Sequence, residues 1–177
     1  MKTPSQVIEV YLQPGEWWFG DRDTRIRTVL GSCVSIVIWH PRRHVGGMCH
    51  YMLPNRTRKT GQPLDGRYAE EAMQLLVAEI AKADTRPQEY EAKLFGGGSM
   101  FSPDDCHGRS QTKGQVHDRN VDAGRALVAK YGFQVKAEHL GGCGHRQLVF
   151  DIWSGHAWLK HTPLSGSAGK QREGDRQ

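Results

Sequence analysis

Short apolar runs dominate the chain, and most of them predict β-strands. Two runs rich in β-branched residues, 26–30 and 33–39, flank the pair Gly31-Ser32. β-Branched residues favour strands, and a glycine lets the backbone bend where a bulkier residue would resist. The pattern therefore predicts two strands joined at a bend, with Cys33 at the start of the second strand.

Seven further runs have the apolar content or the alternation of strands. They are residues 6–12, 16–19, 45–53, 89–95, 133–137, 147–153 and 156–160. Residues 16–19 are few enough to form only the edge of a strand, so we expect about eight strands in all. Pro14-Gly15 ends the first run, and Ser154-Gly155 predicts a hairpin between the last two.

Helical spacing of apolar residues occurs in two segments, 68–83 and 120–131, and Gly132 is a typical helix stop. Strands that are often adjacent in sequence, interrupted by two helices, predict an α+β fold. We expect a β-sandwich-like antiparallel core of two packed sheets, flanked by helices.

The 177 residues predict one domain over residues 1–161, followed by a tail from 162 to 177 in which Gly, Ser, Lys and Arg replace apolar residues. The apolar content of 37% is that of a soluble globular protein, and no run approaches a membrane span or a secretion signal. Four cysteines at irregular spacing favour reduced thiols. We therefore expect a cytoplasmic protein without membrane insertion.

The net charge of +5 comes largely from the tail and from the segment Arg56-Thr57-Arg58-Lys59. No aromatic residues interleave with these charges, so nucleic-acid binding is not predicted. The polar loop 54–66 around this segment is a candidate substrate-binding loop, because structureless loops of this length are often functional. Its charges either steer a partner or are ordinary solvated surface.

The chemistry of the chain centres on Cys33 and His50, seventeen positions apart, the latter within the run 45–53. If residues 41–44 form a turn between antiparallel strands, the imidazole reaches the thiol, and a Cys with a His in reach is the minimum for thiolate catalysis. The alternative for Cys33 is a small buried hydrophobe. Strand alternation turns Cys49 to the opposite face from His50, or the two exchange roles if the register differs.

A phosphate-binding loop and a zinc site are two alternatives that the sequence supports only weakly. The run Gly96-Gly97-Gly98-Ser99 lacks the Lys-Ser/Thr ending of a phosphate loop, so close backbone packing is the better interpretation. Three Cys/His pairs (Cys49-His50, Cys106-His107 and Cys143 with His145) lack the spacing between cysteines of structural zinc sites. The sequence therefore predicts neither a cofactor nor a metal.

Five ordered segments resemble the CheD family of bacterial chemoreceptor glutamine deamidases. They are Thr28-Val-Leu-Gly-Ser-Cys33-Val34, Gly46-Gly-Met-Cys-His50-Tyr-Met-Leu-Pro54, Lys93-Leu-Phe-Gly96-Gly-Gly-Ser-Met-Phe101, Arg119-Asn120, and Gly141-Gly142 through Arg146. The resemblance implies a fold similar to that of the cytotoxic necrotizing factor toxins. The chain departs from the family at His117 and His139, where Gly and Asp are usual.

Carried over residue by residue, the resemblance implies Cys33 as nucleophile, His50 as its partner and Thr28 as the third catalytic residue. His50 would lower the effective pKa of Cys33, and Thr28 would orient the imidazole. Glutamine would then be hydrolysed through a Cys33 thioester, with backbone N–H groups near the Gly31-Ser32 bend stabilising the oxyanion.

Two functions follow from the resemblance. The first is a protein-glutamine glutaminase that acts on the cytoplasmic domains of chemoreceptors. The second is a non-catalytic adaptor that binds chemoreceptors or a CheC-type phosphatase. The intact pair of Cys33 and His50 favours catalysis over the adaptor.

Overall fold

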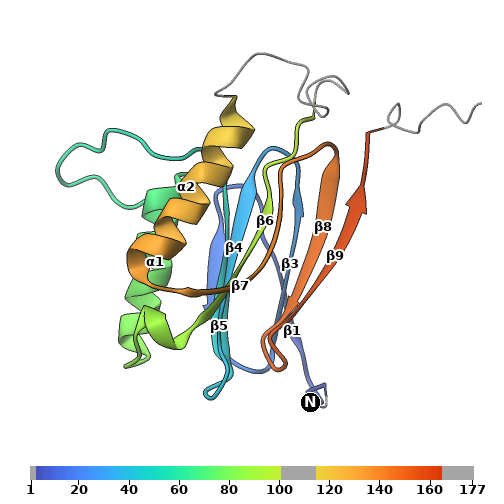
Figure 1. Cartoon of the computed structure of the whole chain (residues 1–177). Helices are drawn as coiled ribbons and strands as arrows, with labels where there is room; N and C mark the ends of the chain where they lie inside the picture. Colours follow the sequence, from blue (N-terminus) through green and yellow to red (C-terminus); the bar gives the residue numbers. More distant parts are fainter. Residues whose placement is uncertain (1–2, 101–114, 165–177) are drawn as a thin grey trace, which may run out of the picture.

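Two β-sheets pack face to face, and two helices cover the outer face of one of them (Figure 1). This computed structural model describes residues 3–100 and 115–164. The strands in these residues are β1 (Ile8–Tyr11), β2 (Trp17–Gly20), β3 (Thr24–Leu30), β4 (Val34–His40), β5 (Val45–Tyr51), β6 (Glu91–Gly96), β7 (Gln134–Leu140), β8 (His145–Asp151) and β9 (His156–Thr162), and the helices are α1 (Ala69–Lys82), the 3₁₀ turn Pro87–Glu89 and α2 (Val116–Tyr131).

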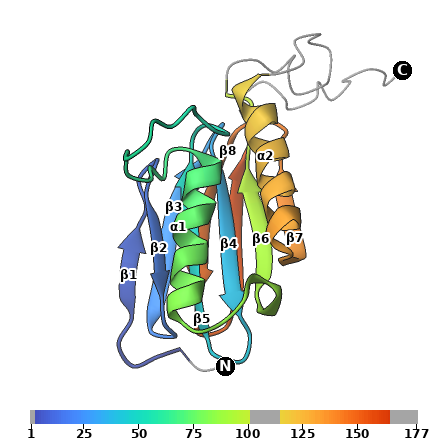
Figure 2. The same cartoon turned by 90° about the vertical axis from the view of Figure 1, so that its left-hand side faces the viewer.

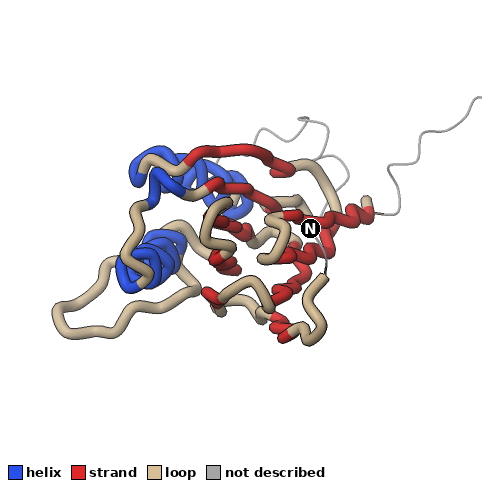
Figure 3. The backbone as a smooth tube through the Cα atoms, turned by 90° about the horizontal axis from the view of Figure 1, so that it is seen from below, coloured by secondary structure: helices blue, strands red, loops and turns tan. Residues whose placement is uncertain are grey.

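The first sheet has the strand order β1-β3-β8-β9, and the second sheet has the order β2-β5-β4-β6-β7. Both helices lie over the second sheet, as the side view shows (Figure 2). Seen along the strands, they stand on one side of the paired sheets (Figure 3). The predicted α+β fold with two packed sheets and outer helices is confirmed.

The sheets are mixed, however, so the expectation of an antiparallel core is wrong for two pairs. β1 runs parallel to β3, and β6 runs parallel to β7. Parallel neighbours need a crossover connection, which α2 provides between β6 and β7. Between β1 and β3 the chain crosses into the second sheet to form β2 and then returns. Both pairings join strands that are distant in sequence, which periodicity alone does not predict.

Element boundaries differ from the expected ones mainly at α2, which begins at Val116 rather than Asn120. Gly132 ends α2 in the left-handed conformation, with φ of 74°, as predicted. β9 continues to Thr162, two residues beyond its predicted end. Of the expected tail, residues 165–177 lie outside the described part of the chain.

Strand alternation divides the core into two clusters, one between the second sheet and the helices and one between the sheets. The helix-side cluster contains Val34, Cys49 and Tyr51. The inter-sheet cluster contains Val37 and Met48, with Cys33 packed against it. The two faces of β4 and β5 therefore have different neighbours, and the inter-sheet face contains the candidate chemistry.

The segment Gly96 to Ser99 packs its backbone against the bend before β4. The N–H groups of Gly97 and Gly98 donate to the carbonyl oxygens of Cys33 at 2.7 Å and of Gly31 at 2.9 Å. A Cβ atom on Gly96 would lie 2.2 Å from the Cys33 oxygen. Since these N–H groups are already used, close packing rather than anion binding is the role of this glycine run.

The oxidation state of the cysteines differs in part from the expected one. In the described part of the chain, Cys33 and Cys49 are free thiols, whereas Cys143 is disulfide-bonded, so the expectation of four reduced cysteines is wrong for Cys143.

None of the helices described here combines the length and apolar content needed to span a bilayer.

The close approach at Gly96 predicts the outcome of one substitution pair. Gly96 has φ of +115° and Gly61 has φ of +83°, but nothing lies within 4 Å of a Cβ at Gly61. We expect Gly96→Ala to lower the free energy of unfolding by about 2 kcal/mol or more, because backbone strain and a backbone clash combine. Gly61→Ala adds only strain, about 1 kcal/mol. Urea denaturation measures both, and equal losses would contradict the proposed steric origin.

Candidate active site

Thr28 on β3 and His50 on β5 meet across the space between the two sheets. Both are buried, at 2% and 1% exposure. Thr28 alternates inward with Ile26 and Leu30 of the inter-sheet cluster. Its Oγ1 lies 2.8 Å from His50 Nδ1, so the structure brings together these two residues of the expected site.

The hydrogen-bond partners of Thr28 determine which nitrogen of His50 carries the proton. Thr28 Oγ1 donates its one hydrogen to the carbonyl oxygen of Leu12, at 2.9 Å. The hydroxyl can then only accept from His50, so Nδ1 carries the hydrogen and Nε2 has the lone pair. Nε2 is buried and has no hydrogen-bond partner in the described part of the chain. An imidazole in this state has its basic nitrogen free for a proton.

Cys33 lies immediately before β4 and is half-buried beside the inter-sheet cluster. In the ladder between β4 and β5, Ser35 pairs with His50, and Val34 pairs with Tyr51. Since Cys33 is two residues before Ser35, its position is diagonal to His50 on the same face, a spacing that side chains can bridge. Among the described residues no hydrogen bond joins the two side chains.

Burial determines whether the side chains of Cys33 and His50 are charged. Desolvation lowers the pKa of His50 to about 4. It also raises the pKa of Cys33, partly offset by a hydrogen bond with the Ser32 side chain. The resting pair is therefore a neutral thiol and a neutral imidazole at pH 7. The expectation that His50 lowers the pKa of Cys33 is wrong for this resting state, because burial opposes charge on both groups.

Cys49 lies on the other face of β5, within the helix-side cluster. Complete burial raises the pKa of its thiol to about 12. Its Sγ faces the carbonyl oxygen of Ile36 at 3.9 Å. Cys49 therefore packs as a small apolar residue, and the alternative in which Cys49 and His50 exchange roles is wrong.

Asn120 is a polar residue of this region that the sequence did not reveal as part of the site. It is fully buried in α2, and its Nδ2 donates to the carbonyl oxygens of Ser32 at 3.2 Å and Met52 at 2.7 Å. Ser32 precedes the candidate nucleophile, and Met52 follows His50 by two residues. The sequence feature that could have identified Asn120 is its spacing: it lies four residues before Gly124, on the same buried face of α2.

Arg146 lies buried at the same end of the sheets, paired with Leu30 in the ladder between β3 and β8. Its Nε donates to His139 Nδ1 at 2.8 Å, and its Nη2 contacts the Gly141 carbonyl oxygen. His139 must be neutral at Nδ1 to accept this bond. Burial and the Arg146 charge both lower the pKa of His139. A neutral histidine thus serves as acceptor at the position where the resemblance implies Asp.

The described residues contain no group of three or more His, Cys, Asp or Glu side chains arranged to hold a metal. Cys106 and His107, two residues of the zinc alternative, lie outside the described part of the chain.

Comparisons with known proteins identify the family to which this chain is similar. A family described as CheD chemotactic sensory transduction matches residues 52–161. A protein of Pseudomonas savastanoi pv. phaseolicola named probable chemoreceptor glutamine deamidase CheD is 49% identical over 93% of this chain and 90% of its own. A Dechloromonas aromatica protein named probable chemoreceptor glutamine deamidase CheD 3 is 50% identical over 89% of each chain.

Among solved structures, the Bacillus licheniformis hypothetical protein YfiH covers 71% of this chain and 51% of its own, with 13% identity and a TM-score of 0.41. A likeness of this size supports no further argument.

The buried neutral His50 predicts a specific dependence of stability on pH. Its folded pKa of about 4 lies below the value of about 6.5 that is expected in the unfolded chain. Between these values only the unfolded state takes up the proton. The contribution of His50 to the free energy of unfolding is therefore constant above pH ~6.5 and falls as the pH decreases toward 4, by at most about 1.4 kcal/mol per pH unit.

We expect His50→Gln to flatten the stability profile between pH 6 and 4, as measured by urea denaturation at several pH values. The exposed His156→Gln is the matched control and should retain the slope of the wild type. Parallel profiles for wild type and His50→Gln would show that His50 is not held neutral by the fold.

Proposed function

Because the chain belongs to the CheD family, we propose that it is a chemoreceptor glutamine deamidase, which converts glutamine side chains of chemotaxis receptors to glutamate and releases ammonia. The observation that carries the proposal is the buried His50, whose Nδ1 is fixed on Thr28 while Nε2 is free on the face of the sheet that Cys33 shares.

In the proposed reaction His50 is a general base rather than the cation of a preformed ion pair. As Cys33 Sγ attacks the glutamine amide carbon, its proton passes to His50 Nε2. The imidazolium then protonates the amide nitrogen, the C–N bond breaks, and ammonia leaves a thioester on Cys33. His50 next takes a proton from water as the water oxygen attacks the thioester carbonyl carbon. The C–S bond breaks, and the imidazolium returns the proton to the Cys33 sulfur, which restores the thiol; the carboxylic acid that is released ionises to glutamate.

Thr28 has the orienting role that a carboxylate or amide side chain has in other triads. Its hydroxyl accepts from Nδ1–H and donates to the Leu12 carbonyl oxygen, so the imidazole has one favourable tautomer. A neutral hydroxyl adds no negative charge beside the imidazolium. Burial lowers the pKa of His50, and Thr28 does not offset this effect with a charge. The low pKa favours return of the proton to the leaving nitrogen.

The proposal includes the partners and the setting of the reaction. The substrate is the cytoplasmic part of a chemoreceptor, and the catalytic domain of residues 1–161 acts in the cytoplasm. A CheC-type phosphatase is the proposed second partner. An adaptor role without catalysis is disfavoured because it gives no reason for a buried His50 whose Nε2 lacks a partner.

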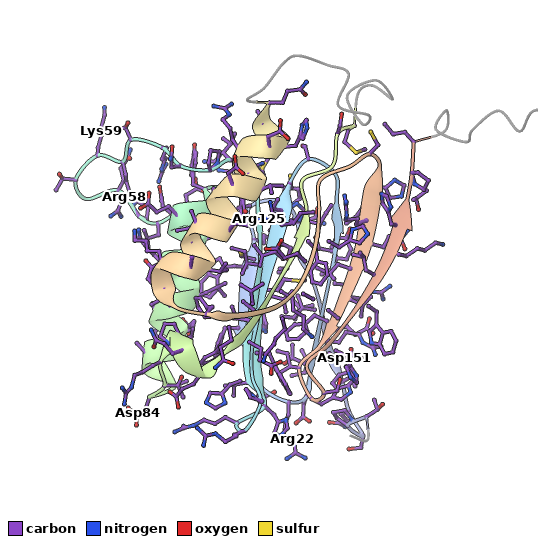
Figure 4. The ribbon with its side chains drawn as sticks, in the orientation of Figure 1. Arg22, Arg58, Lys59, Asp84, Arg125 and Asp151 are labelled. Carbon is purple, nitrogen blue, oxygen red and sulfur yellow. The ribbon has the colours of Figure 1, made fainter. Side chains whose placement is uncertain are left out.

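The loop 54–66, which leaves the end of β5 beyond the site, has two kinds of positive charge. Arg56 is held in the structure, since its guanidinium donates to both carboxylate oxygens of Glu71 on α1, at 2.8 and 3.0 Å. Arg58 and Lys59 form no ion pair within the described residues, and both lie on the projecting part of the loop (Figure 4). Only these two charges are available to steer a receptor toward the site.

Replacement of Cys33 by Ala tests the proposed function directly. We expect a receptor cytoplasmic fragment incubated with the wild type to show the Gln-to-Glu mass gain in its peptides, and Cys33→Ala to lower the rate by at least ~10³-fold. Cys49→Ala, which removes the buried thiol on the opposite face, is the control and should remain active. Activity of Cys33→Ala close to that of the wild type would remove Cys33 from the mechanism.

Removal of the Arg58 and Lys59 charges tests whether the loop steers the substrate. We expect the double variant Arg58→Ser/Lys59→Ser to lower kcat/KM several-fold at low ionic strength, with a smaller effect as salt screens the charges. Turnover at saturating receptor should stay the same. Arg22→Ser/Arg42→Ser removes equal formal charge from the turns between β2 and β3 and between β4 and β5, which lie at the opposite end of the strands from the loop (Figures 1 and 4), and should have little effect. Equal kcat/KM for the loop variant and wild type at every salt concentration would rule out steering.

A further inference from the structure

The side-chain amide of Asn120 links the two segments that contain the candidate nucleophile and base. We propose that Asn120 is a positioning residue that aims the backbone N–H of Cys33 at the oxyanion formed during glutamine hydrolysis. The inference rests on the proposed deamidase function and assigns a role in that reaction to a residue on α2, outside the two sheets.

Peptide geometry connects the Asn120 contact to the site. The Ser32 carbonyl and the Cys33 N–H belong to one planar trans peptide, in which the two groups point in opposite directions. Because Asn120 Nδ2 holds the Ser32 oxygen from the side of α2, the Cys33 N–H points away from the helix. The other sheet lies on that side of the second sheet (Figure 1). His50 faces the same side, since its Nδ1 contacts Thr28 of the other sheet.

The Cys33 N–H has no hydrogen-bond partner among the residues described, and the same holds for the N–H of Ser32. Neighbouring carbonyl groups are fixed: Gly31 accepts from Gly98, and Cys33 accepts from Gly97. The bend is thus held by three carbonyl contacts while its donors stay free. Free, fixed donors beside a nucleophile are the requirement for oxyanion stabilisation.

The second contact of the amide sets the spacing between nucleophile and base. Nδ2 has two hydrogens, and the Ser32 and Met52 oxygens each accept one. A reversed amide would place Oδ1 against two carbonyl oxygens, so these contacts also determine the orientation of the amide. The bend before Cys33 and the strand end after His50 are therefore tied to one atom.

The burial of Asn120 also indicates a role beyond stability. Its Oδ1 is buried and has no partner in the described chain, and an unsatisfied buried acceptor lowers stability. An apolar side chain of similar size would avoid this cost but would leave the two carbonyl groups unheld. An amide at this position is explained by the orientation of the bend.

Tyr51 provides a matched comparison at the same contact between α2 and the second sheet. Its hydroxyl donates to the backbone carbonyl oxygen of Asn120 at 2.7 Å, and the side chain lies in the helix-side cluster. Tyr51→Phe removes one buried hydrogen bond to the helix and leaves the Asn120 amide and both of its acceptors in place. It therefore reports the effect of weaker helix docking without loss of the amide.

The test compares two reactions of Cys33, only one of which forms an oxyanion. Ammonia release from a receptor cytoplasmic fragment gives kcat and KM, and alkylation by iodoacetamide gives the intrinsic reactivity of the thiol. We expect Asn120→Ala to lower kcat by about 10²-fold, with KM and the alkylation rate within about twofold of the wild type. Tyr51→Phe should leave all three quantities within about twofold.

Asn120→Leu has nearly the same size and has no donor, so it serves if the alanine variant does not fold, and it should show the same loss of kcat. If the wild type deamidates the receptor fragment and the Asn120 variant has the same kcat, the inference about Asn120 is overturned and the proposed function is not. Alkylation that falls in proportion to kcat would also overturn it, since Asn120 would then support the thiol and not the oxyanion. If the wild type itself releases no ammonia, the proposed function and this inference fail together.

Discussion

The pairing of Ser35 with His50 in the β4–β5 ladder is the constraint on which the site depends. Side chains alternate between the faces of a strand, so a shift by one residue would turn His50 toward the helices and Cys49 toward the other sheet. The observed register places His50 opposite Thr28 and on the face of Cys33. The helix side receives Cys49 and Tyr51, which fill an apolar cluster.

Burial between the two sheets keeps Cys33 and His50 neutral, and it also leaves one polar atom of His50 without a hydrogen-bond partner among the described residues. A buried imidazole and a buried thiol are each disfavoured as ions, so the resting pair is neutral and a proton moves only during reaction. The free Nε2 of His50 is a buried polar atom without a partner among the described residues, which natural folds usually avoid. Thr28 satisfies the other nitrogen of His50 and is itself held by the Leu12 carbonyl, so within this side chain the unpartnered atom is the one that the reaction needs.

The bend before β4 is held from two sides by groups that are far apart in sequence. The glycine run after β6 donates to the carbonyl oxygens of Gly31 and Cys33, and Asn120 of α2 donates to that of Ser32. All three carbonyl groups are thereby used as acceptors. Glycine is required at position 96 because the Cys33 oxygen lies where a Cβ would stand. The bend is thus held by hydrogen bonds to its carbonyl groups, two from backbone N–H groups and one from the Asn120 side chain.

The sequence by itself determined the local features. Alternation and the turn at 41–44 predicted that Cys33 and His50 share a face, and Gly132 predicted the end of α2, because these features depend on neighbouring residues. Tertiary structure decided the parallel pairs β1–β3 and β6–β7 and the Asn120 bridge. It also formed the Thr28–His50 contact, which the family resemblance implied and no local pattern predicts. It also decided the neutral charge state, since desolvation follows from the packing of two sheets and no local pattern encodes it.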